Sequence, residues 1–486
     1  MNSPIRRLSV VIAALFSALL VATTLVQFVQ AKNLDAMAAN KRTLLDNYSR
    51  ERGSILVGGQ AIAKSVQVDD QYRWLRTYPQ GELYSHITGF YAYSVGNPYG
   101  LEHASDALLS GDSDALFVRR MTDLLTGRRS AGASLELTLN AKAQQAAERA
   151  LGKSRGAVVA LDPKTGAVLA MVSHPNYDPN ALSSHDLTKA AAAWKALSTD
   201  PKQAYYNRAI GGNLYPPGST FKVVTAAAAL ENGLVEDEKS LVPGPAVLDL
   251  PLTDATLPNE NRRACGANDR TTLIHALEIS CNTAFASLGL ELGGEKLRAQ
   301  AARFGFGDSL RIPMPVSPST VPADLNEPQA AQSAIGQYEV RTTPLQMAMV
   351  AAGIANGGSV MTPYLVQSVR SADLDVLETT SPKELSRAVE PRTAEILTKM
   401  MVSVVENGSG VRAQINGVQV AGKTGTAQHD LDRPPHAWFI AFAPANDPKI
   451  AVAVVVEDGG VTGSEAGGGR IAAPIARAVM EAVVGQ

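Results

Sequence analysis

The sequence predicts an α+β fold in which an antiparallel sheet is flanked by helices and carries a helical lobe. Residues 155–173, RGAVVALDPKTGAVLAMVS, hold two β-prone runs joined by a turn with Pro and Gly, which predicts a β-hairpin. A second hairpin is predicted near the end of the chain, where His436–Pro444 is followed by Lys449–Asp458. Strands from both ends of this region therefore form one sheet.

Alanine-rich, helix-prone segments lie between the two hairpins, among them Ser219–Asn232 and Arg341–Ala355. After the second hairpin, a Gly-rich break precedes another helical segment, Ile471–Val484. These helices are expected to flank the sheet and to build the inserted lobe.

The composition excludes several functional classes. The chain has 486 residues, of which 45% are hydrophobic and 19% are charged, enough for two or three globular domains. Lys+Arg number 44 against 46 Asp+Glu, so there is no basic excess for binding nucleic acid. The two cysteines form no C-x-x-C, and the seven histidines include no H-E-x-x-H. We therefore expect no metal and no cofactor.

Residues Leu8–Val29 are uncharged and about long enough to cross a bilayer as a helix. Arg6 and Arg7 precede them, which favours a cytoplasmic N-terminus and places the rest of the chain outside the membrane. Basic residues on the other flank weaken this bias: Lys32, Lys41 and Arg42.

A cleavable signal peptide, cut at Val29-Gln30-Ala31, is the competing interpretation of this stretch. Its apolar run exceeds the roughly 7–15 residues of that class, so we favour an uncleaved single-pass anchor. The predicted organisation is a cytoplasmic N-terminus at 1–7, a transmembrane helix at 8–29, an N-terminal non-catalytic module at 32–151 and a catalytic domain at 152–486.

The first candidate motif is S-x-x-K, in which Ser219 and Lys222 follow Tyr215-Pro216-Pro217-Gly218 at the start of a predicted helix. Residues at i and i+3 share one helical face. A serine becomes a nucleophile when a base takes its proton, and burial makes a lysine neutral enough to be that base. Alone, the motif is weak evidence, and a capped core helix whose lysine reaches solvent is the default interpretation.

The second motif is S-x-N, formed by Ser280 and Asn282 between two helix-like patterns. A loop there can present a hydroxyl that relays a proton and an amide that binds substrate. The third motif is Lys423-Thr424-Gly425-Thr426, which on a strand edge would let an extended peptide pair alongside. Lys164-Thr165-Gly166 repeats the tripeptide inside the first hairpin, and we interpret that copy as a turn.

In this order, the three motifs resemble the active-site signature of penicillin-binding proteins and serine β-lactamases. Over about residues 155–486 the chain resembles the class B penicillin-binding proteins. Further segments that carry the resemblance are Asn207-Arg208-Ala209, Ala334-Ile335-Gly336-Gln337, Thr343-Pro344-Leu345-Gln346-Met347, Gly357-Gly358 and Thr362-Pro363.

The N-terminal module also carries this resemblance. Arg52-Gly53-Ser54-Ile55 and Gly100-Leu101-Glu102 resemble the corresponding module of that class, and the combination is most similar to the actinobacterial type A enzymes. Two positions depart from the pattern: Val57 where Asp is frequent, and Tyr338 where Gly is frequent.

The resemblance implies the transpeptidase fold of penicillin-binding proteins, a docking or dimerisation module and peptidoglycan cross-linking during growth or division. Ser219 would attack the penultimate D-Ala of a donor stem peptide, with Lys222 as base and Ser280 as relay. Asn282 would orient the donor amide, and β-lactams would acylate the serine. The terminal carboxylate would be held by Lys423, Thr424 and Thr426, beside Gly425. The implied partner is a polytopic membrane glycan polymerase.

Cys265 and Cys281 are expected to form a disulfide, because an exposed unpaired thiol outside the membrane is a liability. The bond would close a loop worth about 3 kcal/mol in the chain-entropy model and would brace the Ser280 loop.

Other functions stay open at this stage. A D,D-carboxypeptidase uses the same acyl-enzyme, and a β-lactamase of the glutamate-using kind needs an E-x-x-L-N loop that we do not find. A non-enzymatic β-lactam sensor or scaffold is the third candidate, but only about seven residues precede the span to pass a signal inward.

Overall fold

The structure is a computed structural model that describes residues 3–30, 48, 50–93, 95–116, 131–212, 214–373, 375–430, 432–460 and 467–485. Its centre is a five-stranded antiparallel sheet of order β15-β16-β17-β5-β6. These strands are β5 (Gly156–Leu161), β6 (Val168–His174), β15 (Ala421–Ala427), β16 (His436–Ala443) and β17 (Ile450–Val456). Both predicted hairpins are present, and β17 pairs with β5, so strands almost 300 residues apart are neighbours, as expected.

Both faces of this sheet are buried, which explains why its strands are continuous apolar runs. Val158, Val452 and Val454 point to one face, against helices α8 (Ala141–Leu151) and α17 (Gly468–Val484). Val159 and Val455 point to the other face, which α15 (Pro344–Ala355) covers. The alternation follows from the two-residue period of a strand.

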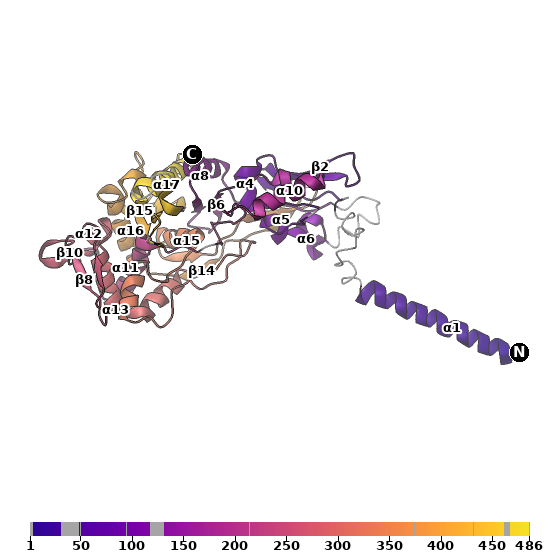
Figure 1. Ribbon diagram of the computed structural model, residues 1–486, viewed down its shortest axis with the longest axis horizontal. Helices are drawn as coiled ribbons and strands as arrows, with labels where there is room; N and C mark the ends of the chain where they lie inside the picture. The colour runs from indigo at the N-terminus through magenta and orange to yellow at the C-terminus, as the bar shows by residue number, and fades with distance from the viewer. Residues whose placement is uncertain are drawn as a thin grey trace.

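A helical lobe lies beside the edge strand β15 and forms one end of the molecule in Figure 1. It contains α11 (Lys222–Glu231), α12 (Leu273–Glu278), α13 (Asn282–Arg303), α14 (Glu327–Ser333) and α16 (Pro391–Glu406). Short elements complete this region: η3 (Gly218–Phe221), β7 (Leu241–Pro243), β8 (Val247–Asp249), β9 (Thr256–Pro258), η4 (Ala267–Asp269) and β10 (Arg270–Thr272). Outside it, β11 (Ser359–Met361) pairs with β14 (Glu384–Arg387) and packs on α15, and η5 (Val411–Ala413) packs on α17.

The N-terminal module is built on a second sheet, of order β13-β12-β4-β1-β2-β3. Its strands are β1 (Ile55–Val57), β2 (Gln60–Gln67), β3 (Trp74–Thr77), β4 (Ser134–Leu137), β12 (Val366–Arg370) and β13 (Val376–Thr379). The short helices nearby are α4 (Gly81–Thr88), α5 (Gly100–Ala104), α6 (Asp106–Ser110), η2 (Asp114–Leu116), α9 (Pro179–Leu182) and α10 (Leu187–Ser198).

Two segments cross the division expected between residues 151 and 152. β12 and β13 come from the later part of the chain, yet they complete the N-terminal sheet by pairing through β4. Conversely, α8 precedes the division and packs on β6 and α17 of the central sheet. The two units therefore share secondary structure and a common interface.

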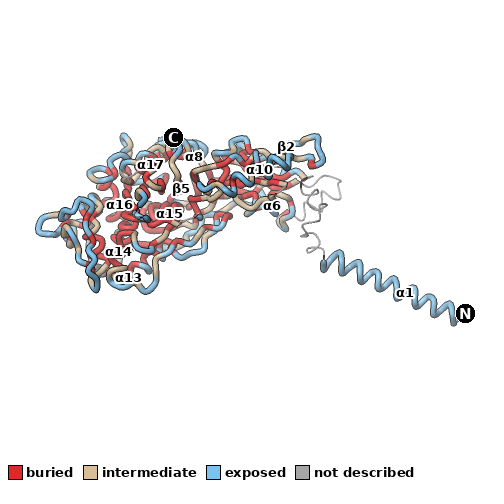
Figure 2. Tube along the Cα trace, in the orientation of Figure 1, coloured by how far each residue is buried: buried red, intermediate tan, exposed pale blue. Residues whose placement is uncertain are grey.

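The N-terminal helix α1 (Ser3–Thr24) continues into the π-helical turn η1 (Leu25–Val29). Together they span 27 residues, and an 18-residue window within them has a mean hydropathy of 2.4, so the helix is long and apolar enough to cross a membrane. Figure 2 shows this helix exposed along its whole length, unlike the red interior of the two folded units. The flanking residues Ala31, Lys32, Lys41 and Arg42 lie outside the described part of the chain.

Candidate active site

Ser219 lies in a tight turn before the alanine-rich helix α11. We expected an α-helix from Ser219, but residues 218–221 form the 3-10 turn η3 and α11 begins at Lys222. Gly218 explains the tight geometry, because its φ of +54° favours glycine. Its amide donates a hydrogen bond of 2.9 Å to the carbonyl of Gly336. The segment Ala334–Gln337 therefore packs against the turn that carries Ser219.

The Lys222 side chain is fully buried at the start of α11. Its side-chain nitrogen Nζ lies 2.7 Å from the Ser280 carbonyl, 3.3 Å from Ser280 Oγ and 2.7 Å from Asn282 Oδ1, and hydrogen-bonds to them. Burial, followed by the nearby charge of Lys423, holds the pKa of Lys222 well below its usual value. A lysine in this state can accept a proton.

Ser280 lies in the turn between α12 and α13, and Asn282 is the first residue of α13, at the junction that the sequence predicts. Ser280 has a φ of +60°, a left-handed conformation that turns its hydroxyl toward both lysines. The buried Asn259 accepts hydrogen bonds from the amides of Asn282 and Thr283, at 2.9 and 3.0 Å. These hydrogen bonds fix the start of α13, next to the Ser280 turn.

A disulfide joins Cys265 to Cys281. Cys281 lies between Ser280 and Asn282, and Cys265 follows the segment that contains Asn259. The bond therefore ties the loop of Asn259 to the turn that presents the second motif.

The third motif lies on β15, the edge strand of the central sheet. Lys423 is fully buried, and its Nζ donates to Ser280 Oγ at 2.9 Å and to the Thr424 carbonyl at 2.8 Å. Burial lowers the pKa of Lys423 to about 7. Thr424 Oγ1 lies 2.6 Å from Ser409 Oγ, which orients that hydroxyl in the cleft.

Gly425 is required by close packing between β15 and the serine turn. A Cβ atom at this position would lie 2.9 Å from Thr220 Cγ2 and 2.9 Å from Trp438 Cβ. A larger residue would separate the strand from the turn that carries Ser219.

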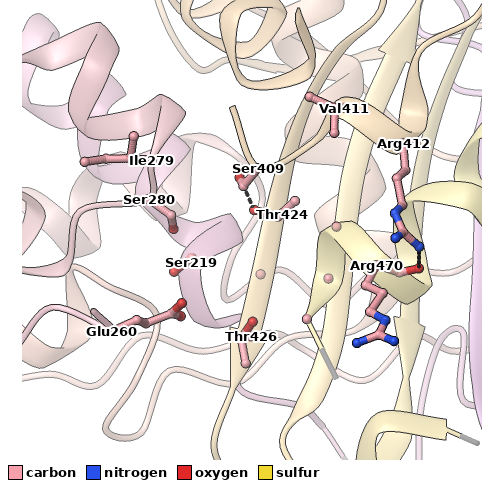
Figure 3. A pocket seen from close by; sticks show the side chains of 14 residues that line it. Ser219, Glu260, Ile279, Ser280, Ser409, Val411, Arg412, Thr424, Thr426 and Arg470 are labelled. Carbon is pink, nitrogen blue, oxygen red and sulfur yellow. Dashed lines mark hydrogen bonds between the residues drawn. The ribbon is translucent and has the colours of Figure 1, made fainter. Parts of the chain in front are cut away.

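These motifs converge on one cleft with a volume of about 400 Å³ (Figure 3). Ser219, Ser280, Thr424, Gly425 and Thr426 line it, whereas the buried Lys222 and Lys423 approach from beneath Ser280. Lys164, in contrast, lies between β5 and β6, where its exposed side chain pairs with Asp447 at 2.6 Å. The copy of K-T-G at Lys164 is thus a hairpin turn, as predicted.

Several lining residues were not identified from the sequence. They include Glu260, Ile279, Ser409, Val411, Arg412 and Arg470. Arg470 lies in the first turn of α17, directly after three consecutive glycines, and these glycines were an available signal. Glu260 follows Asn259 on the loop braced by the disulfide, and no local pattern marks it.

Comparison with known sequences adds an independent observation. A family described as "Penicillin binding protein transpeptidase domain" matches residues 156–481, and "Penicillin binding protein A dimerisation domain" matches residues 52–135. The chain belongs to the penicillin-binding protein transpeptidases. The resemblance that the motifs indicated, including its class B and actinobacterial PbpA character, is confirmed.

This penicillin-binding protein is similar to named relatives over its full length. It is 47% identical to the peptidoglycan D,D-transpeptidase PbpA of Mycolicibacterium smegmatis, over 100% of this chain and 99% of the relative. It is 45% identical to the protein of the same name from Mycobacterium tuberculosis, over the same shares of the two chains.

Solved structures also resemble this penicillin-binding protein. The ceftriaxone acyl-enzyme complex of penicillin-binding protein A from M. tuberculosis matches with a TM-score of 0.87 and 45% identity, covering 90% of this chain and 100% of that one. The penicillin G acyl-enzyme complex of the same protein matches with a TM-score of 0.84 and 44% identity, covering 89% and 99%. These matches confirm the predicted fold class.

One departure from the family pattern has a visible structural cost. Tyr338 follows Gly336-Gln337 with a φ of +58°, a conformation that favours glycine. The side chain is exposed, so the tyrosine is sterically tolerated although its backbone is strained.

Proposed function

We propose that the chain is a peptidoglycan D,D-transpeptidase that cross-links stem peptides through an acyl-enzyme on Ser219 and is itself acylated by β-lactams. The observation that carries this proposal is the convergence of Lys222 and Lys423 on Ser280 Oγ, in the cleft that Ser219 lines. The full-length similarity to PbpA transpeptidases and to β-lactam acyl-enzyme structures supports it.

Acylation begins when Ser219 Oγ attacks the penultimate D-Ala carbonyl of a donor stem peptide. Lys222, kept neutral by burial, takes the hydroxyl proton as the new C–O bond forms. The C–N bond then breaks, and the proton passes through Ser280 to the departing amine of D-alanine. An acceptor amine next attacks the ester carbonyl, forms the cross-link and returns a proton to Ser219 Oγ.

Strand β15 holds the donor peptide. Because β15 is an edge strand, an extended peptide can pair alongside it. Lys423, Thr424 and Thr426 bind the terminal carboxylate, while Asn282 orients the donor amide. The backbone amides of Ser219 and Thr426 form the oxyanion hole, a contribution of a few kcal/mol per donor.

The membrane arrangement follows from α1. Residues 8–29 anchor the chain in a single pass, with Arg6 and Arg7 in the cytoplasm and the catalytic domain, 152–486, outside. The module at 32–151 separates the domain from the bilayer and docks a polytopic membrane glycan polymerase, which supplies uncross-linked glycan to the cleft.

Labelling with a fluorescent penicillin tests the proposal. The full chain in detergent is compared with Ser219→Ala and with Lys164→Ala, a change in the exposed turn that repeats the third motif. We expect stable labelling of the wild type and of Lys164→Ala, and none of Ser219→Ala. Failure of the wild type to label would contradict the assignment of the nucleophile.

A second assay separates cross-linking from hydrolysis. Product analysis with a donor stem peptide, with and without an added amine acceptor, should show a new amide bond only with the acceptor. Release of D-alanine without any acceptor-linked product would identify a D,D-carboxypeptidase on the same fold.

A further inference from the structure

Beyond the cleft, two histidines and one aspartate meet at the end of the central sheet. His436 is the first residue of β16, Asp458 follows β17, and His429 lies two residues after β15. Their nearest ligand atoms all lie within 4.8 Å of one another. Asp458 Oδ1 is 3.1 Å from His429 Nε2 and 3.9 Å from His436 Nδ1.

These spacings are close to those of a tetrahedral metal site. With bonds of about 2.0–2.2 Å to nitrogen and oxygen, neighbouring ligand atoms of a zinc ion lie roughly 3.3–3.5 Å apart. The aspartate is already near that distance from both rings. Small rotations of the partly exposed His429 would bring all three atoms into range.

A second observation points to a cation here. Asp458 Oδ1 is buried and accepts no hydrogen bond from the part of the chain that the structure describes, although it faces both imidazoles. A buried carboxylate oxygen without a donor is costly, and a bound cation removes that cost. The other oxygen, Oδ2, is paired with Arg433, which fixes the carboxylate as outer-shell partners of metal ligands do.

One interaction competes with binding. His436 Nδ1 accepts a hydrogen bond of 3.2 Å from the amide of Asp458, and the two imidazoles stack with centroids 3.8 Å apart. A bound ion would replace that hydrogen bond and tilt the rings out of their parallel stack. Binding of the ion therefore replaces one neutral hydrogen bond and one ring stack with coordination bonds.

We propose that His429, His436 and Asp458 bind one divalent cation of the zinc class, with water completing its coordination. Two imidazoles and one carboxylate are donors that suit zinc, cobalt or nickel, whereas calcium and magnesium prefer oxygen ligands alone. The site joins the segment after β15 to the end of β17. Because Ala427 pairs with His436, bound metal would brace the end of the strand that carries Thr426.

Titration of the metal-free full chain in detergent tests this site. After chelator treatment and dialysis, zinc binding is measured by competition with a chromophoric chelator, and cobalt binding by its visible spectrum. We expect one equivalent of zinc, intense cobalt bands of a tetrahedral site, and a rise in the melting temperature with zinc.

Variants distinguish this site from adventitious binding. His429→Ala and Asp458→Asn should each weaken zinc binding about tenfold or more, since each loses a ligand or its charge. His275→Ala removes a half-exposed histidine paired with Glu278 at 3.5 Å and should leave binding unchanged.

Penicillin labelling of every variant confirms that it is folded, because it depends on the cleft rather than on the metal ligands. Absence of a zinc equivalent in the wild type would overturn the proposal, as would equal affinity in His429→Ala and Asp458→Asn. Either result would leave the proposed transpeptidase activity standing, because that is tested by Ser219 labelling.

Discussion

Lys222 and Lys423 are both fully buried and direct their side-chain nitrogens at the same atom, Oγ of Ser280, at 3.3 and 2.9 Å. Two ammonium groups so close in a buried site repel each other, so at least one is neutral at pH 7. Burial lowers the pKa of both. One hydroxyl between two such amines is a route by which a proton can move between them.

The depressed pKa of Lys423 predicts a pH dependence of stability. Its pKa is about 7 in the folded protein and about 10.4 in an unfolded chain. Between these values the unfolded state binds more protons, so the free energy of unfolding rises with pH. The destabilisation that results from burying a charged Lys423 is fully present below pH 7 and is absent above about pH 10.4.

Lys423→Met isolates this effect. Between pH 7 and 9, the unfolding free energy of the wild type should rise relative to that of the variant by up to about 1.4 kcal/mol per pH unit. Urea unfolding of both proteins at pH 7, 8 and 9 measures it. Parallel curves for the two proteins would mean that Lys423 stays charged in the cleft.

Gly336 packs directly against the turn that carries Ser219, although the two are more than 100 residues apart in the sequence. Its φ is +71°, and a Cβ atom there would lie 2.1 Å from the carbonyl oxygen of Gly218, directly before Ser219. Gly336→Ala should therefore displace the nucleophile, and shifts of about 1 Å can slow a reaction on the order of 10²-fold. The measurement is the rate of acylation by penicillin.

Gly233→Ala is the matched control. Gly233 has a similar φ of +67°, but no atom lies within 4 Å of the position that its Cβ would take. Both substitutions should cost about 1–2 kcal/mol of backbone strain. Only Gly336→Ala should slow acylation, and equal rates in the two variants would show that the contact with Gly218 is unimportant.

Local patterns predicted the hairpins, the alanine-rich helices and the three motifs, because each is encoded within a few consecutive residues. The order of the motifs then predicted that Ser219, Ser280 and Lys423 would meet. Glu260 was missed because the long loop that contains Asn259 brings it to the cleft. No hydrophobic period or motif spacing in the sequence predicts the course of that loop. The pairing of β12 with β4 was missed for the same reason, since it joins segments more than 200 residues apart.

The expectation that the chain has no metal rested on sequence spacing alone. His429 and His436 are seven residues apart, which fits no short metal motif, and Asp458 comes from another strand. The antiparallel pairing of β15 with β16 brings His429 near His436, and the pairing of β16 with β17 brings Asp458 to them. Such a cluster is visible in three dimensions alone.

The disulfide between Cys265 and Cys281 gives a third prediction. It closes a loop of 16 residues, worth about 3 kcal/mol in the chain-entropy model. A variant with both cysteines changed to Ser should lose roughly this free energy of unfolding and should be acylated more slowly, because the Ser280 turn loses its brace. Wild-type protein in reductant should behave in the same way. Unchanged stability in both cases would show that the hydrogen bonds of Asn259 suffice.

The fourth prediction concerns a buried carboxylate in the N-terminal module. Glu102 is fully buried and lies 2.5 Å from Arg52 Nε and 2.6 Å from Arg76 Nε. Burial alone would raise the pKa of Glu102, but the charges of Arg76 and Arg52 outweigh it and lower the pKa. The contribution of this group to stability is therefore present at neutral pH and is lost as the pH falls through its depressed value.

Removing this carboxylate leaves two buried guanidinium groups without their shared partner. Glu102→Ala should therefore cost about 3–5 kcal/mol of unfolding free energy. Asp106→Ala is the control, because Asp106 also pairs with Arg52, at 2.8 Å, but its side chain is 51% exposed. That change should cost less than about 1 kcal/mol. Urea unfolding of the three proteins at pH 7 measures both values. A loss in Glu102→Ala as small as that in Asp106→Ala would mean that water reaches the arginines. The ion pairs of Arg52 with Glu102 would then contribute little to stability.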